Sequence, residues 1–374
     1  MKIKCSKDDL LRGLNSVYRA VSAKNTIYGL GGILLQAEAG EMIYKATDLE
    51  IAIEYRDKNI EIEEEGSIIV PGRYFMEIAK RLPDEEILFS TDGYSLYIRY
   101  SGSEITVNGY DQEEFPAFPQ VTGEVRGSFN LADFQKDIKE VSIAGAYDES
   151  RPILTSVLFE IEGPEINMVA TDTHRLAVKK TVWQNTGEKE NAKALIPARV
   201  LREIAKSSLD EDERMEVVIG ESQISFSLGN TLFISRLVEG KFPNYQPVIP
   251  AEEGFIAKAE ISVSHFISTL DRAAVMVKDQ AREKAGRVKL TLENENLTVR
   301  SHNTDVGKMS EAIPVFQEGQ DLELVVNSRY FLEFLAVVDS DTIIIKFTGP
   351  STPIVMIPKD EENYLYLALP LRTQ

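Results

Sequence analysis

The segments VPGRYFMEIAKRL at 70–82, IPARVLREIAKSS at 196–208 and VNSRYFLEFLAVV at 326–338 are three copies of one amphipathic pattern. Apolar residues take the same places in each copy: Tyr74, Phe75, Ile78 and Ala79, then Val200, Leu201, Ile204 and Ala205, then Tyr330, Phe331, Phe334 and Leu335. Their i, i+1, i+4, i+5 spacing puts them on one face and predicts a helix in each segment.

A second helical pattern lies upstream of each copy, at offsets of 124 and 132 residues. Its matched apolar residues are Leu10, Leu14 and Val17, then Phe134, Ile138 and Val141, then Phe266, Leu270 and Ala273. Between the two helices each copy has a strand-like run with a polar triplet, at 46–48, 170–172 and 301–303. Several blocks in the same order at nearly constant offset favour one ancestral unit used three times over three unrelated α+β domains.

The repeat predicts an α+β protein of three domains, at 1–121, 126–250 and 254–374. Each copy opens on an alternating strand, followed by a helix that in copy one begins near Ser6. Alternating runs bounded by turn residues predict strands at 32–37, 41–46, 87–90, 95–100 and 105–107. We therefore expect two helices and about eight short antiparallel strands per copy, with both helices on one face of the sheets.

The composition is that of a soluble globular protein, with 43% hydrophobic and 27% charged residues among 374. No apolar run approaches the ~20 residues of a membrane span, and the opening MKIKCSKDDL lacks an apolar signal core. The single cysteine, Cys5, excludes an internal disulfide and suits a reducing compartment. We expect a cytoplasmic protein without a membrane partner.

The net charge of −19 is unevenly distributed. The six predicted helical segments together carry +5, so the remainder carries −24. Basic helices on an acidic protein indicate a positive surface for a phosphate-bearing partner. The alternative is that Lys and Arg collect there because they favour helices.

The sequence shows no sign of a metal or cofactor site. The three histidines, His174, His265 and His302, have no zinc-like spacing with Cys5, and no phosphate-binding glycine loop or nucleophile elbow occurs. Acid–base chemistry is suggested at one place, Asp172-Thr173-His174-Arg175. On a strand Asp172 and His174 would share one face and Arg175 the other, which favours a binding surface over a catalytic site.

Several motifs resemble the bacterial sliding clamp family, the beta subunit of DNA polymerase III. They are the opening MKIK with its Leu10-Leu11 helix, ATDTHRLAV at 170–178, KFPNY at 241–245 and YLYLALPLR at 364–372. The resemblance implies a non-enzymatic processivity clamp: a head-to-tail homodimeric ring that encircles double-stranded DNA, with helices inside and sheets outside. It implies as partners DNA polymerase and an ATP-dependent clamp loader, which bind through short peptide motifs. A peptide-binding scaffold of the same fold that never closes into a ring is the alternative.

The resemblance also implies three sets of site residues. Family positions for DNA contact match Lys24 and Arg73, to which the repeat adds Arg199, Arg202 and Lys206. The ring is expected to close through Ile105 and Val107 of one subunit and Val275 and Met276 of the other. The family's peptide-binding groove lies between domains two and three and matches Leu154, Thr171, Thr173, His174, Arg175, Leu176, Pro243, Val248, Asn327, Tyr330, Leu367, Leu369, Pro370, Leu371 and Arg372. In this groove His174, Arg175 and Arg372 are expected at the rim, and leucines and prolines on the floor.

Several places depart from the family pattern. Pro152 and Ile153 stand where the family has a pair of DNA-contacting aromatics, so that contact is not expected here. Thr26-Ile27-Tyr28-Gly29-Leu30 stands where the family often has Thr-Ile-Pro-Ile-Leu, which changes the expected conformation of that loop. Thr173 replaces a commoner glycine in ATDTHRLAV, which is expected to reshape the groove.

Overall fold

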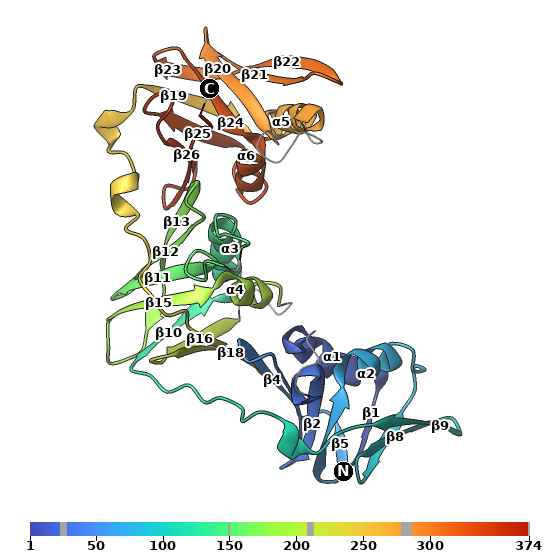
Figure 1. The fold of residues 1–374 in the computed structure, drawn as a ribbon. Coiled ribbons are helices and arrows are strands. Elements are labelled where there is room, and N and C mark those ends of the chain that lie inside the picture. The colour runs from blue at the N-terminus through green and yellow to red at the C-terminus, as the bar shows by residue number, and fades with distance from the viewer. Residues whose placement is uncertain (23–27, 149, 208–212, 278–285, 373–374) are drawn as a thin grey trace. The chain divides into compact units, whose positions relative to one another are not determined.

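The computed structural model describes residues 1–22, 28–148, 150–207, 213–277 and 286–372. Its α-helices come in pairs, two to a repeat copy (Figure 1): α1 (Lys7–Val17), α2 (Gly72–Ala79), α3 (Leu131–Ser142), α4 (Ala198–Ile204), α5 (Val263–Val277) and α6 (Ser328–Leu335). No helix within the described ranges is long and apolar enough to cross a membrane.

Nine strands are described in each repeat copy. Copy one contains β1 (Lys2–Cys5), β2 (Gly32–Glu38), β3 (Glu41–Thr47), β4 (Ile51–Asp57), β5 (Glu61–Glu64), β6 (Gly66–Pro71), β7 (Ile87–Asp92), β8 (Ser95–Tyr100) and β9 (Ser103–Asn108). Copy two contains β10 (Val125–Asn130), β11 (Ser156–Glu162), β12 (Glu165–Thr171), β13 (Arg175–Val182), β14 (Gln184–Asn185), β15 (Asn191–Pro197), β16 (Arg214–Ile219), β17 (Gln223–Leu228) and β18 (Thr231–Arg236). Copy three contains β19 (Ala257–Ser262), β20 (Arg287–Glu293), β21 (Asn296–Asn303), β22 (Gly307–Pro314), β23 (Phe316–Gly319), β24 (Leu322–Asn327), β25 (Thr342–Phe347), β26 (Ile354–Pro358) and β27 (Tyr364–Ala368).

The chain packs as two compact units, and the middle copy contributes to both. The first unit comprises Met1–Ala132, Gln184–Glu190 and Lys206–Leu237. It holds a five-stranded sheet of order β5-β1-β7-β8-β9 and a nine-stranded sheet of order β14-β10-β16-β17-β18-β4-β3-β2-β6, all antiparallel. Helix α1 packs on β3, β4 and α2.

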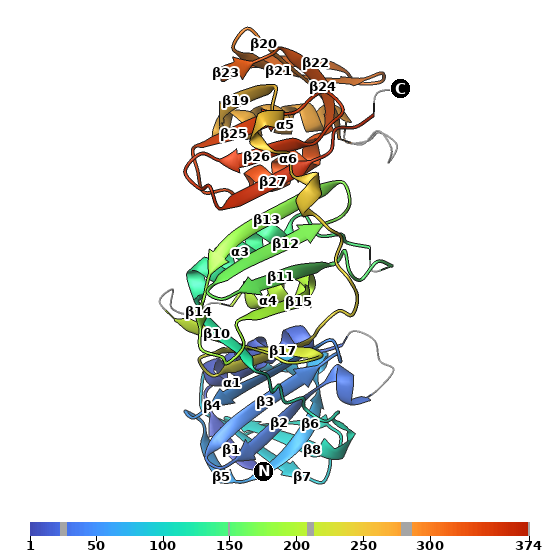
Figure 2. The same ribbon diagram turned by 90° about the vertical axis from the view of Figure 1, so that its left-hand side faces the viewer.

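The second unit comprises Asp133–Trp183, Asn191–Ala205 and Val238–Gln374. Its nine-stranded sheet runs β15-β11-β12-β13-β27-β26-β25-β19-β23, and a four-stranded sheet runs β22-β21-β20-β24. Within this unit helices α3, α4, α5 and α6 lie on one side of the larger sheet, and the strands face the viewer in Figure 2.

Neighbouring copies are joined by the same strand pair each time. The strand after the polar triplet pairs with the last strand of the following copy, β4 with β18 and β13 with β27. The registers are Ile51 opposite Ser235 and Arg175 opposite Ala368. The corresponding strands at the two ends of the repeat, β22 and β9, each form the outer edge of their sheet.

The predicted helix faces are buried except at Tyr74, which is exposed, and at Ile78 and Tyr330, which are half-buried. Phe75, Leu201 and Phe331, matched by the repeat, are fully buried, whereas Tyr74 is largely exposed instead of belonging to the apolar face. The predicted start of the first helix is confirmed, because the Ser6 side chain accepts a hydrogen bond from the Asp9 amide, as an N-cap does.

The structure shifts the third polar triplet by one residue. Strands β3, β12 and β21 end at Thr47, Thr171 and Asn303, and three residues separate each end from the next strand. The side-chain oxygen of each of these residues accepts a hydrogen bond from the backbone amide two residues later, at 2.9 to 3.1 Å. Asn303 therefore matches Thr171, not Asp172, and the matching triplet is 302–304 rather than 301–303.

Candidate functional site

The segment after β27 brings together residues that the sequence analysis assigned to one site. The amide of Leu369 donates to the carbonyl of His174 at 2.8 Å, and the amide of Leu371 donates to the carbonyl of Val325 at 2.7 Å. Arg287 donates from Nη2 to the Arg372 carbonyl at 3.3 Å. Residues 369–372 are thus held between the start of β13 and the edge strand β24, all within the second unit.

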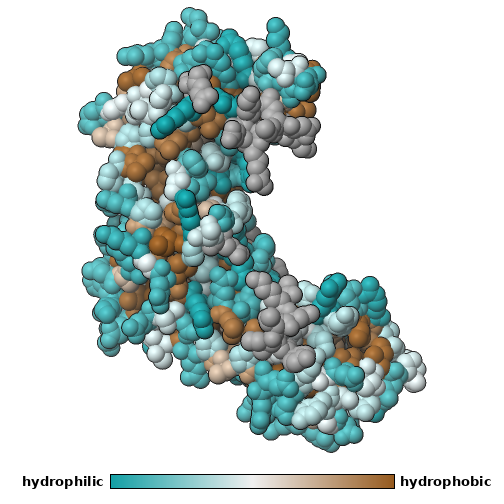
Figure 3. Space-filling model, in the orientation of Figure 1, coloured by the Kyte–Doolittle hydropathy of each residue, from teal (hydrophilic) through white to brown (hydrophobic). Residues whose placement is uncertain are grey.

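A hydrophobic cluster lies beneath this segment. Leu176 and Leu367 are directly opposite each other across the β13–β27 pair, and both are buried in it. The partly buried Ile153 and Leu369 pack against the cluster from outside. Figure 3 shows hydrophobic side chains among polar ones on the strand side of this unit. Such a surface, partly open and apolar, is suited to burying aliphatic and aromatic side chains of a peptide.

The segment around 242–248 borders the same cluster. Phe242 and Tyr245 are buried in it, and the Tyr245 hydroxyl donates to Glu160 Oε2 at 2.5 Å. Between and after these anchors, Pro243 and Val248 are exposed. Leu154 is buried, and its carbonyl accepts the Ala146 amide at 2.8 Å.

The expectation that Arg175 stands at the rim is wrong. Its side chain is 2% exposed, and it forms ion pairs with Asp172, at 2.9 Å, and with Glu333 on α6. Its guanidinium carbon lies 4.6 Å from the centre of the Tyr330 ring. Burial lowers the pKa of Arg175, but Tyr366 and Glu333 raise it by more, so the pKa lies above its usual value. Arg175 therefore stabilises the packing of copy two on copy three, and its guanidinium is not exposed for binding an acidic ligand.

The expected strand geometry of residues 172–175 is also wrong, because Asp172 caps a turn. Asp172 Oδ1 accepts the amides of His174 and Arg175 at 2.9 and 3.0 Å. The turn places Thr173 at φ +78°, a left-handed conformation, and its counterpart Leu49 in copy one has φ +75°. Thr173 and His174 are exposed, so these two, with Arg372, form the polar side of the surface.

Three of the five expected DNA-facing residues are exposed in the structure, and their contact with DNA stays a prediction. Arg73 and Arg199 are exposed and occupy the second position of α2 and α4, and Lys206 is exposed beyond α4. Arg202 is half-buried, and its guanidinium carbon lies 5.6 Å from the centre of the Tyr147 ring. Lys24 lies outside the described residues. Sequence reasoning missed Arg329, which holds the same second position in α6 and is exposed.

The expected ring-closing residues lie on the edge strand β9 and on helix α5. Ile105 and Val107 belong to the edge strand β9, where Ile105 is half-buried and Val107 buried. Val275 on α5 is 70% exposed, and Met276 beside it is half-buried. The Met276 carbonyl accepts from Asn303 Nδ2 at 2.9 Å, which ties α5 to the end of β21.

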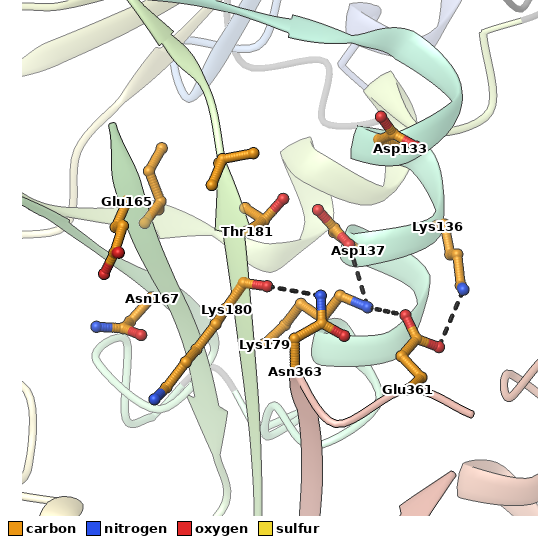
Figure 4. A pocket seen from close by; sticks show the side chains of 12 residues that line it. Asp133, Lys136, Asp137, Glu165, Asn167, Lys179, Lys180, Thr181, Glu361 and Asn363 are labelled. Atoms are coloured by element: carbon orange, nitrogen blue, oxygen red, sulfur yellow. Dashed lines mark hydrogen bonds and ion pairs between the residues drawn. The ribbon is translucent and has the colours of Figure 1, made fainter. Parts of the chain in front are cut away.

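A buried charge cluster that the sequence analysis missed lies at the other end of β13. Lys179, 2% exposed, forms ion pairs with Asp137 at 3.4 Å, with Glu140 at 2.7 Å and with Glu361. Lys136 also pairs with Glu361, at 2.9 Å. A cavity of about 570 Å³ lies beside the cluster and is lined by Lys136, Asp137, Lys179 and Glu361 among others (Figure 4). Burial raises the pKa of Glu140 to about 7 and also raises the pKa of Asp137.

This cluster connects three parts of the second unit. Asp137 and Glu140 lie on α3, Lys179 on β13, and Glu361 in the turn before β27. The Tyr364 hydroxyl donates to the Glu140 carbonyl at 2.7 Å. The signal in the sequence was Lys179 directly after the apolar run Leu176-Ala177-Val178, but its partners lie 39 to 182 residues away and could not be named.

Within the described ranges, no group of three or more His, Cys, Asp and Glu side chains is arranged to hold a metal ion.

Comparison with known proteins covers the whole chain. Residues 1–119, 129–244 and 246–372 match the families described as DNA polymerase III beta subunit, N-terminal, central and C-terminal domain. The beta sliding clamps of Staphylococcus epidermidis and Staphylococcus aureus are 32% and 30% identical, with complete coverage of both chains. The crystal structure of the DNA polymerase sliding clamp from Bacillus subtilis superposes with a TM-score of 0.94 at 30% identity, again over both whole chains.

Proposed function

The chain belongs to the family of DNA polymerase III beta subunits, the bacterial sliding clamps, and from this premise we propose how its own residues serve that role. Its function is that of a processivity factor, an accessory protein of DNA polymerase. The finer features proposed are a closed homodimeric ring, a peptide-binding surface and a set of DNA-facing cations. A scaffold that never closes is not favoured.

The domains we propose are 1–121, 126–250 and 254–374. We propose that the ring closes through the same strand pairing that joins neighbouring copies within the chain. Strand β22 occupies the same position in copy three as β4 and β13 do in copies one and two. Strand β9 is the last strand of copy one, as β18 and β27 are of copies two and three. Both β22 and β9 are outer strands with unpaired edges. An antiparallel pair between β22 of one subunit and β9 of the other would complete the series, and two such pairs close a ring with C2 symmetry.

The repeat also fixes the register of that pair. The turn before β22 is as long as the turn before β13, so Gly307 matches Arg175. The β8–β9 and β17–β18 hairpins share a two-residue turn, with Tyr100 opposite Ser103 and Leu228 opposite Thr231. Ser103 therefore matches Thr231, and Val107 matches Ser235. Gly307 is then opposite Val107 of the partner subunit, and Met309 is opposite Ile105 of the partner subunit. Val275 and Met276 would cover the junction from α5.

The proposed peptide site is the surface formed by the β13–β27 junction and the segment that follows β27. The observation that carries it is the convergence of Leu176, Leu367 and Leu369 on one apolar cluster beside the exposed His174. We propose that polymerases and the clamp loader bind here by short linear segments, with their apolar side chains on the cluster. Arg175 supports this surface without contacting the peptide.

We propose that the chain has no catalytic activity of its own. The segment suited to acid–base chemistry is occupied by structural contacts, since both Asp172 oxygens bind within the turn or to Arg175. Loading onto DNA would then depend on another protein that hydrolyses ATP. The expected location is the cytoplasm, where the DNA of a bacterium lies.

Solution mass and retention on DNA test the ring together. Light scattering should give about twice 41.9 kDa. Once loaded, the protein should stay on nicked circular duplex DNA and leave it when a restriction enzyme linearises the circle. A monomer, or a dimer equally retained on circles and linear fragments, would remove the encircling mechanism and leave the fold unchanged.

A further inference from the structure

The turn before β4, at the junction of copies one and two, repeats the turn before β13. Asp48 Oδ1 accepts the amides of Glu50 and Ile51 at 3.0 and 2.9 Å. Asp172 accepts the two corresponding amides in copy two. Leu49 lies in the middle of the turn and is 43% exposed. The polar side of the proposed peptide site therefore has a counterpart one copy earlier.

The end of β18 is held in the same way as the chain after β27. The Arg236 amide donates to the Glu50 carbonyl at 3.0 Å. In copies two and three the Leu369 amide donates to the His174 carbonyl at 2.8 Å. The β4–β18 junction, which lies within the first unit, thus has the same backbone contacts as the β13–β27 junction in the second.

The side chains of the two junctions differ along one row across the strands. In the second unit every member of the row is apolar and directly opposite the next on the neighbouring strand: Leu195, Leu158, Val169, Val178 and Leu365. The matching row of the first unit is Ile69, Leu34, Lys45, Glu54 and Leu232. The first unit therefore has a lysine and a glutamate where the second unit has two valines.

The Lys45–Glu54 pair is largely buried, and both charges have partners. Lys45 Nζ lies 3.3 Å from Glu54 Oε2, and the two side chains are 16% and 9% exposed. Lys45 Nζ also lies 5.4 Å from the centre of the Phe118 ring, and Glu54 Oε1 accepts from Arg56 Nε at 2.7 Å. An apolar side chain placed on this row would remove the remaining water from both charges, a cost that a row of valines and leucines does not have.

We propose that the β4–β18 junction is a latent second peptide site, and that the Lys45–Glu54 pair prevents the apolar peptides of the β13–β27 junction from binding there. Arg236 contributes, because it is exposed at the position where Leu369 packs on the apolar cluster. The ligand class is the same at both junctions, a short segment with aliphatic and aromatic side chains. The pair thus limits each subunit to one peptide. This proposal rests on the proposed peptide site.

The test is to give the first junction the residue types of the second. The substitutions are Lys45→Val, Glu54→Val and Arg236→Leu, combined in one triple variant. Replacing both members of a buried ion pair by apolar residues is often neutral for stability, so this variant should fold. Titration calorimetry with a synthetic peptide copied from the clamp-binding segment of a polymerase should give two peptides per subunit, against one for the wild type.

The reciprocal exchange and a control pair complete the experiment. Val169→Lys with Val178→Glu puts the charged pair into the proposed peptide site and should abolish binding, while circular dichroism shows an intact fold. Lys4 and Glu61 are also directly opposite each other, on β1 and β5 of the first unit. Lys4→Val with Glu61→Val adds the same two valines away from the junction and should leave one peptide per subunit.

The outcomes separate this proposal from the proposed peptide site. If the triple variant still binds one peptide while Val169→Lys with Val178→Glu loses binding, the latent site is refuted and the peptide site stands. If Val169→Lys with Val178→Glu binds as the wild type does, the peptide site itself is wrongly assigned. A second peptide on the control variant would show that added valines bind peptides anywhere, which also refutes the latent site. Should the triple variant not fold, Lys45→Met with Glu54→Leu, closer in volume to the native pair, is judged by the same outcomes.

Discussion

The guanidinium of Arg175 stacks on the ring of Tyr330, with 4.6 Å between the guanidinium carbon and the ring centre. Arg175 opens β13 in copy two, and Tyr330 lies on α6 in copy three. The same guanidinium bridges Asp172 and Glu333. One buried side chain thus makes a ring contact and an ion pair across the junction that carries the proposed peptide site, and a second ion pair within its own turn.

Removing this arginine should destabilise the second unit strongly. Arg175→Ala would leave Asp172 and Glu333 without their buried partner, and breaking a buried ion pair from one side costs about 3–5 kcal/mol. Arg175→Lys should recover part of this, because an ammonium keeps the charge but not the planar, two-sided geometry. Urea unfolding followed by circular dichroism measures both, and His174→Ala serves as the exposed control. An Arg175→Ala protein as stable as the wild type would contradict the bracing role.

Thr173 should be a strained position that glycine relieves. Its φ of +78° costs a residue with a side chain about 1–2 kcal/mol, a cost that glycine does not have. Glycine also has greater conformational freedom in the unfolded chain, which cancels part of this gain in stability. We expect Thr173→Gly to raise the free energy of unfolding by about 0.5–1 kcal/mol. Thr106→Gly, within strand β9, should lower it instead. Equal effects at the two positions would show that backbone conformation is not the cause.

The contrast between Phe331 and Arg175 shows what the sequence could predict. The burial of Phe331, Phe75 and Leu201 follows from helical periodicity, and the repeat carried it through all three copies. The position of Arg175 depends on Glu333, 158 residues away, and on a turn that only the hydrogen bonds of Asp172 reveal. The Lys179 cluster and the contact of Tyr147 with Arg202 were missed for the same reason. Periodicity predicts which face of a helix or strand is buried, but not which residues far along the chain a side chain contacts.

The Lys179 cluster should make stability depend on pH in the direction opposite to an ordinary ion-paired carboxylate. Burial raises the pKa of Glu140 to about 7, above its ordinary value of 4.5. Between these values the folded state binds the proton and the unfolded state does not, so this residue's contribution to stability falls as pH rises. The slope is on the order of 1 kcal/mol per pH unit.

Glu140→Gln isolates this contribution. The variant cannot titrate, so its stability relative to the wild type should increase from pH 5 to pH 8. Glu77→Gln, at an exposed glutamate whose pKa is lowered by Arg81 and Lys80, is the control: that carboxyl is ionised in the folded and the unfolded state from pH 5 to pH 8, so its difference from the wild type should not change with pH. Unfolding by urea at each pH gives the comparison, and a pH-independent difference between Glu140→Gln and the wild type would contradict the raised pKa.

His174 should contribute to peptide binding without contributing to folding. It is exposed beside the apolar cluster, and its backbone carbonyl, which any residue supplies, holds Leu369. His174→Ala should therefore keep its unfolding curve and weaken binding of a fluorescent polymerase-derived peptide about tenfold, or ~1.4 kcal/mol. His265→Ala, on α5, is the control histidine. Unchanged affinity of the His174 variant would count against this surface as the peptide site.

The proposed ring register can be tested by cysteine pairs, because the native Cys5 is buried and leaves the surface free of competing thiols. Met309→Cys combined with Ile105→Cys puts the two thiols directly opposite each other across β22 and the partner subunit's β9. Residues opposite in an antiparallel pair lie about 4.5–5.5 Å apart, within the range that a disulfide spans. Mild oxidation should therefore give a covalent dimer that survives denaturation without reductant.

Met309→Cys combined with Thr106→Cys is the matched control, since adjacent strand residues point to opposite faces and this pair should not crosslink. Efficient crosslinking of the control, with none in the first pair, would mean that the strands meet one residue out of the register seen at the two internal junctions. The ring would then close, but not by the rule that joins the copies. Crosslinking in neither pair, with a dimer still observed by mass, would place the subunit contact on other strands.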